Sequence, residues 1–126
     1  MIPSKYTCQG ENISPEISWD AVPGAQGYIV IMTDPDVPHR YLPLATWVHW
    51  VVYNIPKDVT HLPEGIPKTK LLENDSRQGK TSFKDAGYGG PCPPFGTHRY
   101  YFRVYAVDNS ITLTPEKATR KQILNY

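Results

Sequence analysis

The sequence predicts an all-β domain of short strands separated by turns. Its 126 residues include 13 prolines and 9 glycines, which are scattered between apolar segments, as turn residues are. Nine tyrosines and three tryptophans, together with many β-branched residues, favour strands over helices. A chain of this length fits one domain, and no internal repeat or boundary divides residues 1–126.

The first half of the chain predicts an edge strand and a buried strand. Residues 13–19 alternate between apolar and polar side chains and contain Pro15, which suits an edge strand. Residues 28–33 form a continuous apolar run, which is typical of a strand covered on both faces. Residues 34–38 carry two prolines that cannot donate ladder hydrogen bonds, so we expect the strand to give way there to an irregular loop.

The second half predicts two alternating strands and a helix. In residues 46–54 the period of two places four large side chains on one face: Trp47, His49, Val51 and Tyr53. In residues 98–107 the more apolar face begins with His98 and Tyr100. Residues 56–73 mix prolines with charges and predict a surface excursion. Thr114 and Pro115 have the N-cap and first-turn pattern of a helix that runs to Leu124.

Charge and composition exclude several classes of function. Lysine plus arginine number 13 and aspartate plus glutamate 12, so no broad positive field attracts nucleic acid. No apolar run reaches the length of a membrane span, and the first residues lack a signal-peptide stretch, so we expect a cytoplasmic protein. Cys8 and Cys92 are too few for a zinc finger or a disulfide scaffold, and we predict no cofactor and no metal. A single bridge between them is possible, but their spacing does not decide it.

Three polar features stand at the ends of the predicted strands. They are Asp34, His49 and the glycine-rich segment 87–94 that leads to His98. Glycines 89 and 90 can turn successive amides toward one point, and such a concavity binds anions. Histidines add donors that gain charge near neutral pH. Together these features predict a site for a phosphoryl-type group.

Each of these residues also has a simpler interpretation. A single histidine in a strand is more often a satisfied core residue than a ligand-binding one, which applies to His49. Asp34 before a proline is typical of a turn residue that bonds its own backbone. Segment 87–94 could be a rigid surface loop, and His39 and His61 lie in polar surroundings typical of solvated side chains.

The order and spacing of five motifs are more specific than any one of them. These are YTCQGENISP at 6–15, DPDVP at 34–38, TWVHWVVYNIP at 46–56, GYGGPCPP at 87–94 and HRY at 98–100. With them the chain resembles the bacterial and archaeal, Raf-kinase-inhibitor-like branch of the phosphatidylethanolamine-binding protein family. The resemblance implies a Greek-key β-sandwich with peripheral short helices.

The resemblance also implies a ligand site and a function. Its residues would be Asp34, His49, Gly90, Pro94, His98 and Tyr100. The implied ligand is phosphate, a phosphorylated small molecule or a phospholipid head group, bound without conversion, and the implied partners include a kinase or a protease that the protein regulates. The alternative is a hydrolase in which Cys92, or a water activated by a histidine, attacks a substrate in the same pocket.

The chain departs from the family pattern at both ends. Members usually have a further strand before the position of Ile2, and a helix and a last strand after that of Leu124. We therefore expect a domain that lacks these terminal elements, or one that completes its sheet with a second copy of the chain, because open strand edges favour association.

Overall fold

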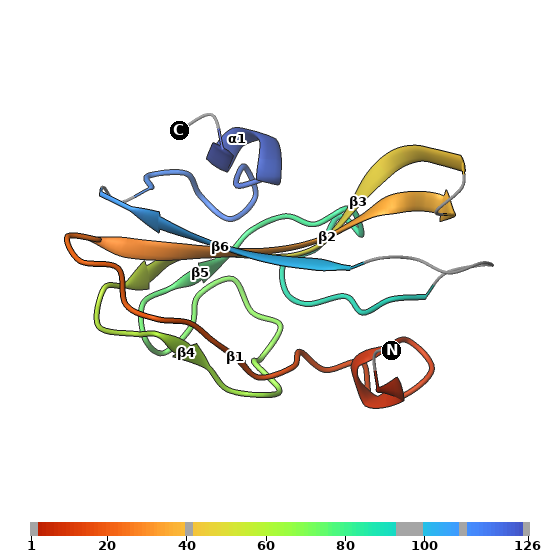
Figure 1. Cartoon of the computed structure of the whole chain (residues 1–126), viewed down its shortest axis with the longest axis horizontal. Helices are drawn as coiled ribbons and strands as arrows, with labels where there is room; N and C mark the ends of the chain where they lie inside the picture. Colours follow the sequence, from red (N-terminus) through yellow and green to blue (C-terminus); the bar gives the residue numbers. More distant parts are fainter. Residues whose placement is uncertain (1–2, 40–41, 93–99, 109–110, 125–126) are drawn as a thin grey trace.

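The fold is built on a four-stranded antiparallel sheet. The computed structural model describes residues 3–39, 42–92, 100–108 and 111–124. The strand order is β5-β3-β2-β6, with β2 at Gly27–His39, β3 at Leu42–Pro56, β5 at Arg77–Gln78 and β6 at Tyr101–Val107. A two-stranded sheet pairs β1, Ile17–Ser18, with β4, His61–Leu62 (Figure 1). The described helices are a 3-10 helix, η1 at Ser4–Tyr6, and α1 at Arg120–Leu124.

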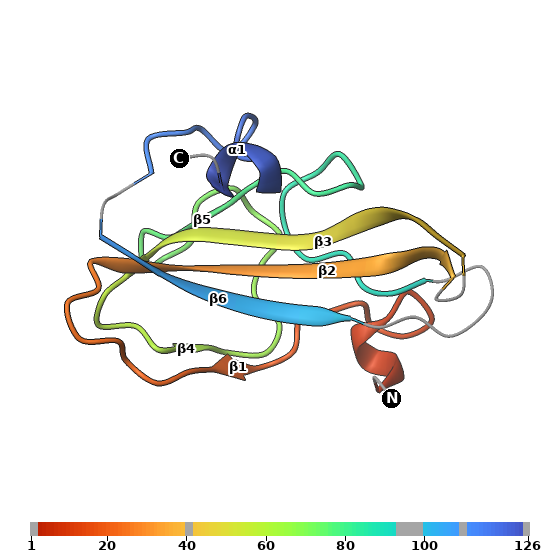
Figure 2. The same cartoon turned by 45° about the horizontal axis from the view of Figure 1, so that its top comes forward.

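Each face of the main sheet is covered by its own layer. Figures 1 and 2 show β1 and β4 on one side of the sheet and α1 on the other. The first core lies toward β4 and consists of Tyr28, Val30, Met32, Trp50, Val52, Ile55, Leu62 and Tyr88. The second core lies toward α1 and consists of Ile29, Ile31, Val51, Tyr53, Ile111, Ala118 and Ile123. The run 28–33 therefore supplies both cores alternately, and the predicted all-β class is confirmed.

The expectation of a loop at residues 34–38 is wrong. Strand β2 continues through this segment to His39, paired with β3. The pairing is irregular there, with register shifts between Asp34 and Val37 and again between Val37 and Pro38. Proline is tolerated in a strand where the ladder is interrupted, because its missing N–H then costs no hydrogen bond. The prolines therefore coincide with irregular pairing but do not end the strand.

The C-terminal helix begins later than its sequence pattern predicts. Thr114 and Pro115 open a hydrogen-bonded turn, in which Lys117 and Ala118 donate back to their carbonyls at 2.9 and 3.3 Å. The carbonyl of Ala118 then accepts from the amide of Lys80 at 3.0 Å, so it is not available to a helix. The α-helix begins only at Arg120, after this contact has fixed the segment on the sheet. In the described residues no helix has the length and apolar character needed to cross a membrane.

Asn54 joins the C-terminal layer to the sheet. Its side-chain amide donates to the carbonyl of Ile111 and its carbonyl accepts from the Ile111 amide, both at 2.8 Å, while its own φ is 55°. Asn54→Ala should lower the free energy of unfolding by about 3 kcal/mol, from two lost hydrogen bonds and a strained left-handed backbone. Asn54→Gly loses the same bonds without the strain and should cost about 1 kcal/mol less. Urea unfolding of both variants measures this, and equal losses would show that φ contributes nothing.

Candidate functional site

A β-bulge in β3 sets the direction of the His49 side chain. Met32 on β2 lies opposite Trp50, whereas the next residue, Thr33, lies opposite Val48, so His49 is the extra residue between them. An extra residue breaks the regular alternation of side chains. The prediction that His49 shares a face with Val51 is therefore wrong, because Val51 belongs to the second core and the His49 ring contacts Tyr100, which packs on the first.

Gly89 holds the His49 residue at two points. The Gly89 amide donates to the backbone carbonyl of His49 at 3.0 Å, and the Gly89 carbonyl lies 2.6 Å from Nδ1 of the ring. A carbonyl oxygen only accepts, so Nδ1 carries the proton in this contact. The tautomer of a neutral His49 is thereby fixed, and Nε2 is the ring nitrogen that changes from acceptor to donor when the ring is protonated.

Aromatic rings surround the His49 imidazole. The rings of Phe83 and Tyr100 each lie 5.6 Å from it between centroids, and Trp47 meets Phe83 edge to face at 5.4 Å. His49 is 4% exposed, whereas Phe83 is 42% exposed, so this ring forms the outer wall of the group. Sequence reasoning missed Phe83, because it belongs to none of the five motifs.

Asp34 lies on the same face of the sheet as His49. Along β2 the side chains of Tyr28, Val30 and Met32 alternate into the first core, and Asp34 continues that alternation. Its neighbour Thr33 points the other way, where Arg103 donates to its hydroxyl at 3.4 Å. Asp34 is 3% exposed. The structure therefore places Asp34, His49 and Tyr100 on one face of the sheet, and their part in ligand binding stays a prediction.

Gly89 and Gly90 do not form the expected anion-binding concavity. The Gly89 amide is bonded to His49, and the Gly90 amide donates to Oδ1 of Asn12 at 2.8 Å. Neither glycine has a positive φ; in this segment Gly87 does, at 99°. Both are required for close approach instead, since a Cβ on Gly89 would overlap the Phe83 ring and one on Gly90 would overlap the backbone of Tyr6. Gly90 therefore affects the site indirectly, through its contacts with the N-terminal residues Tyr6 and Asn12.

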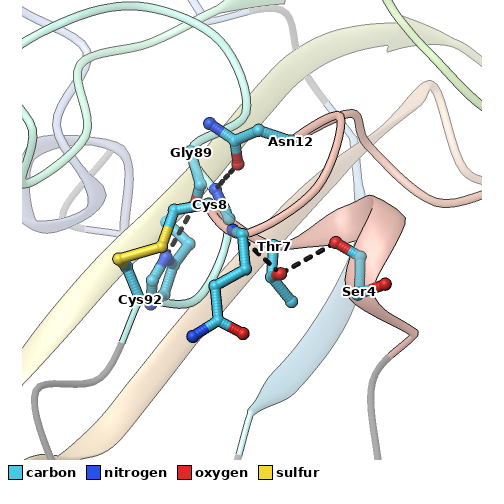
Figure 3. The surroundings of a disulfide bond; sticks show 9 residues. Ser4, Thr7, Cys8, Asn12, Gly89 and Cys92 are labelled. Carbon is cyan, nitrogen blue, oxygen red and sulfur yellow. Dashed lines mark hydrogen bonds between the residues drawn. A yellow bond between two sulfur atoms is a disulfide. The ribbon is translucent and has the colours of Figure 1, made fainter.

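An N-terminal segment, residues 3–13, is docked on the glycine-rich segment. Figure 3 shows the bridge between Cys8 and Cys92, whose Cα atoms lie 5.4 Å apart, and the bond of Asn12 to the glycine-rich segment beside it. The Cys8 amide also donates to the carbonyl of Pro91 at 3.2 Å. The disulfide that the sequence left open is therefore present.

Tyr88 anchors the same contact from the first core. Its hydroxyl donates to the carbonyl of Tyr6 at 2.6 Å, and its ring meets Trp50 edge to face at 5.6 Å. Burial raises the pKa of Tyr88 far above its ordinary value, with smaller contributions from Tyr100 and Tyr6. Tyr88 therefore stays a neutral donor over the whole physiological range, and the signal for this role was its place inside the glycine-rich motif.

Two of the predicted site residues, Pro94 and His98, lie outside the described residues, so the expected convergence of His98 with His49 stays a prediction. Within the described part of the chain no group of three or more histidine, cysteine, aspartate or glutamate side chains could hold a metal ion.

Comparisons with known proteins agree with this architecture. The sequence profile of the phosphatidylethanolamine-binding protein family matches residues 1–126. The chain belongs to this family. Among curated relatives, a UPF0098 protein of Methanothermobacter thermautotrophicus is 48% identical over 124 residues, which cover 98% of this chain and 78% of the relative. A UPF0098 protein of Aquifex aeolicus is 43% identical, over 97% of this chain and 70% of its own length.

Two solved structures of the phosphatidylethanolamine-binding protein (PEBP) family share the fold. The PEBP homologue CT736 of Chlamydia trachomatis superimposes with a TM-score of 0.83 at 39% identity, over 98% of this chain and 77% of the other. E. coli YbcL, described as a new member of the mammalian PEBP family, gives 0.78 at 35% identity, over 94% and 73%. The expected all-β fold of the family, with few helices, is therefore confirmed for this member, and membership indicates a ligand-binding protein.

Proposed function

We propose that the protein binds a phosphate-type anion, free or as a phospholipid head group, on the face that carries Asp34, His49 and Tyr100, and that it releases the anion unchanged. The observation that carries the proposal is the contact between Nδ1 of His49 and the Gly89 carbonyl. It makes Nδ1 a donor to the protein, and we expect an anionic ligand to approach the imidazole from its Nε2 side. When the ring is protonated, Nε2–H offers a charge-assisted bond to an anionic oxygen.

Asp34 adds a buried carboxyl group to this face. A carboxylate near an imidazole favours the charged form of the ring, and it repels a bare anion unless a cation is shared. A zwitterionic head group meets both demands, with its phosphate toward His49 and its ammonium toward Asp34. Phosphoethanolamine should therefore bind more tightly than ethyl phosphate, which lacks the ammonium.

We expect binding without hydrolysis. The sulfur of Cys92 is bonded to Cys8, so in this form it is not a thiolate and cannot act as the nucleophile. Regulation of a kinase or a protease would then follow from competition between such a partner and the anion for this face. Incubation with nitrophenyl phosphate and acetate esters should release no nitrophenol, and turnover that His49→Ala abolishes would favour the hydrolase instead.

The affinity for sulfate should fall as the pH rises from about 5.5 to 8, because the neutral ring presents Nε2 as an acceptor to an anion that offers no proton. Sulfate is the better probe here, since a phosphate monoester changes its own charge near about pH 6. Calorimetric titration should show His49→Ala weakening sulfate binding about tenfold or more at pH 5.5 and removing most of the pH dependence, as expected for a lost charged hydrogen bond.

His61→Ala is the matched control. His61 is an exposed histidine on β4, with Nε2 2.8 Å from Glu16, and it lies in the other sheet. Its loss should leave both the affinity and the pH profile unchanged. An affinity that does not vary with pH in the wild-type protein, or an equal effect of the two alanine variants, contradicts a role for the His49 charge.

A further inference from the structure

The docked N-terminal segment is held mainly by its disulfide. None of residues 3–13 is buried, so the segment contributes little apolar burial to its own docking. Its hydrogen bonds to the glycine-rich segment come from Cys8 to Pro91, from Gly90 to Asn12 and from Tyr88 to Tyr6. Lys5 pairs with Glu64 at 2.6 Å, but both side chains are well exposed to solvent. Segments with few buried contacts open readily, so the covalent bridge is the strongest tie.

The bridge is accessible to a reductant. Both Cys8 and Cys92 are exposed, although Tyr88, Gly90 and Pro91 beside them are buried. The thiolate of a dithiol can therefore attack one of the two sulfurs, form a mixed disulfide with it and release the other as a thiolate. The second thiol of the reagent then displaces the first cysteine and closes its own disulfide. Two electrons and, with protonation, two protons pass to the protein, which gains two thiols.

The docked segment is also connected to the proposed site. Asn12 holds the amide of Gly90, and the preceding residue, Gly89, holds the backbone and the ring of His49. Figure 3 shows Gly89 and Asn12 close to the bridge. Release of residues 3–13 removes the support of Gly90, and the hold of Gly89 on the imidazole loosens with it.

We propose that the Cys8–Cys92 disulfide is a redox-sensitive link, and that its reduction by a dithiol frees residues 3–13 from the glycine-rich segment and weakens anion binding at His49. The second half of this statement rests on the proposed function, whereas the first half does not. In a reducing compartment, such as the cytoplasm expected from the sequence, the ratio of reduced to oxidised thiols would then set the fraction of molecules that keep the disulfide. Only that fraction would have the docked segment and the supported His49 site.

The test compares oxidised protein with protein reduced by dithiothreitol. Hydrogen exchange followed by mass spectrometry reports on residues 3–13 and 86–92, and β3 residues 50–53 serve as the internal reference. We expect two new thiols, exchange about tenfold faster or more in the two outer segments, and unchanged exchange in β3. Sulfate affinity at pH 5.5 should fall about fivefold or more on reduction. The variant Cys8→Ala/Cys92→Ala should match the reduced protein and not respond to dithiothreitol.

Three other results would contradict parts of the proposal. Unchanged exchange in residues 3–13 after both thiols have appeared contradicts the link, and so does faster exchange in β3, which would show global unfolding. Faster exchange in the outer segments with unchanged sulfate affinity contradicts the coupling to His49. Absence of sulfate binding in the oxidised protein contradicts the proposed function alone, because the exchange data still decide the release of the segment.

Discussion

Gln78→Leu should lower the free energy of unfolding by about 3 kcal/mol, because it leaves a buried indole N–H and two carbonyls without their partner. Oε1 of Gln78 accepts from Nε1 of Trp50 at 2.7 Å, and both side chains are fully buried. The amide nitrogen of Gln78 donates to the carbonyls of Pro67 and Thr69, also at 2.7 Å. Leucine has a similar volume but satisfies none of these groups. Thermal unfolding should move down by about 10 °C.

A double-mutant cycle with Trp50→Phe isolates the main contact. In the phenylalanine background no indole N–H remains to be orphaned, so Gln78→Leu should cost about 1 to 2 kcal/mol less than it does alone. Denaturant unfolding with matched m-values measures the coupling. Additive effects of the two substitutions would mean that the Trp50 contact contributes nothing net. Gln78 is the last residue of β5, and the chain then runs from Gly79 to Gly89, which contacts His49. We therefore expect Gln78→Leu to disturb the His49 site as well.

Gly90→Ala should both destabilise the protein and disrupt the site. A Cβ at Gly90 would overlap the Tyr6 carbonyl oxygen and lie 3.0 Å from Cα of Thr7, which are backbone atoms and cannot turn away. Either the N-terminal segment or the glycine-rich segment must shift, and the disulfide opposes their separation. We expect a loss of about 3 kcal/mol in unfolding free energy and about tenfold or more in sulfate affinity at pH 5.5.

Gly24→Ala is the control for the generic cost of a methyl group. Gly24 has a φ of 84° and nothing within 4 Å of its added Cβ, so only the left-handed backbone is penalised, by about 1 kcal/mol. Its sulfate affinity should equal that of the wild type. If Gly90→Ala proves no worse than Gly24→Ala in urea unfolding, the glycine-rich and N-terminal segments are not packed as tightly as described.

The strands of the main sheet could be predicted because their apolar patterns are local. The run 28–33, the alternation in residues 46–54 and that in residues 98–107 correspond to β2, β3 and β6. The extension of β2 past Pro38 could not be predicted, because a proline signals a strand end unless the ladder is already interrupted there. The helix start at Thr114 failed for a related reason: the carbonyl of Ala118 has a tertiary partner in Lys80.

The sequence could indicate candidate residues for the site, but not how their neighbours hold them. Asp34, His49 and Tyr100 were proposed from motif order; the structure places them on one face, and their binding role stays a prediction. The roles of Gly89 and Gly90 were not found, since the sequence shows that glycine permits unusual angles but not which neighbour lies too close for a side chain. Likewise, a separation of 84 residues between Cys8 and Cys92 says nothing about their distance in space.

The bulge at His49 is one of several register shifts in the β2–β3 pairing, and it reverses the inside-outside alternation of β3 between Trp50 and Val48. From Trp50 to Tyr53 the side chains alternate between the two cores, whereas His49 contacts Tyr100 and Val48 packs against the second core. Removing Val48 would abolish this bulge and send the imidazole to the α1 side of the sheet, and it would also remove a partly buried side chain that packs against the second core. Because of this one extra residue, substitutions that affect binding and substitutions that affect core packing can occur independently on the same strand.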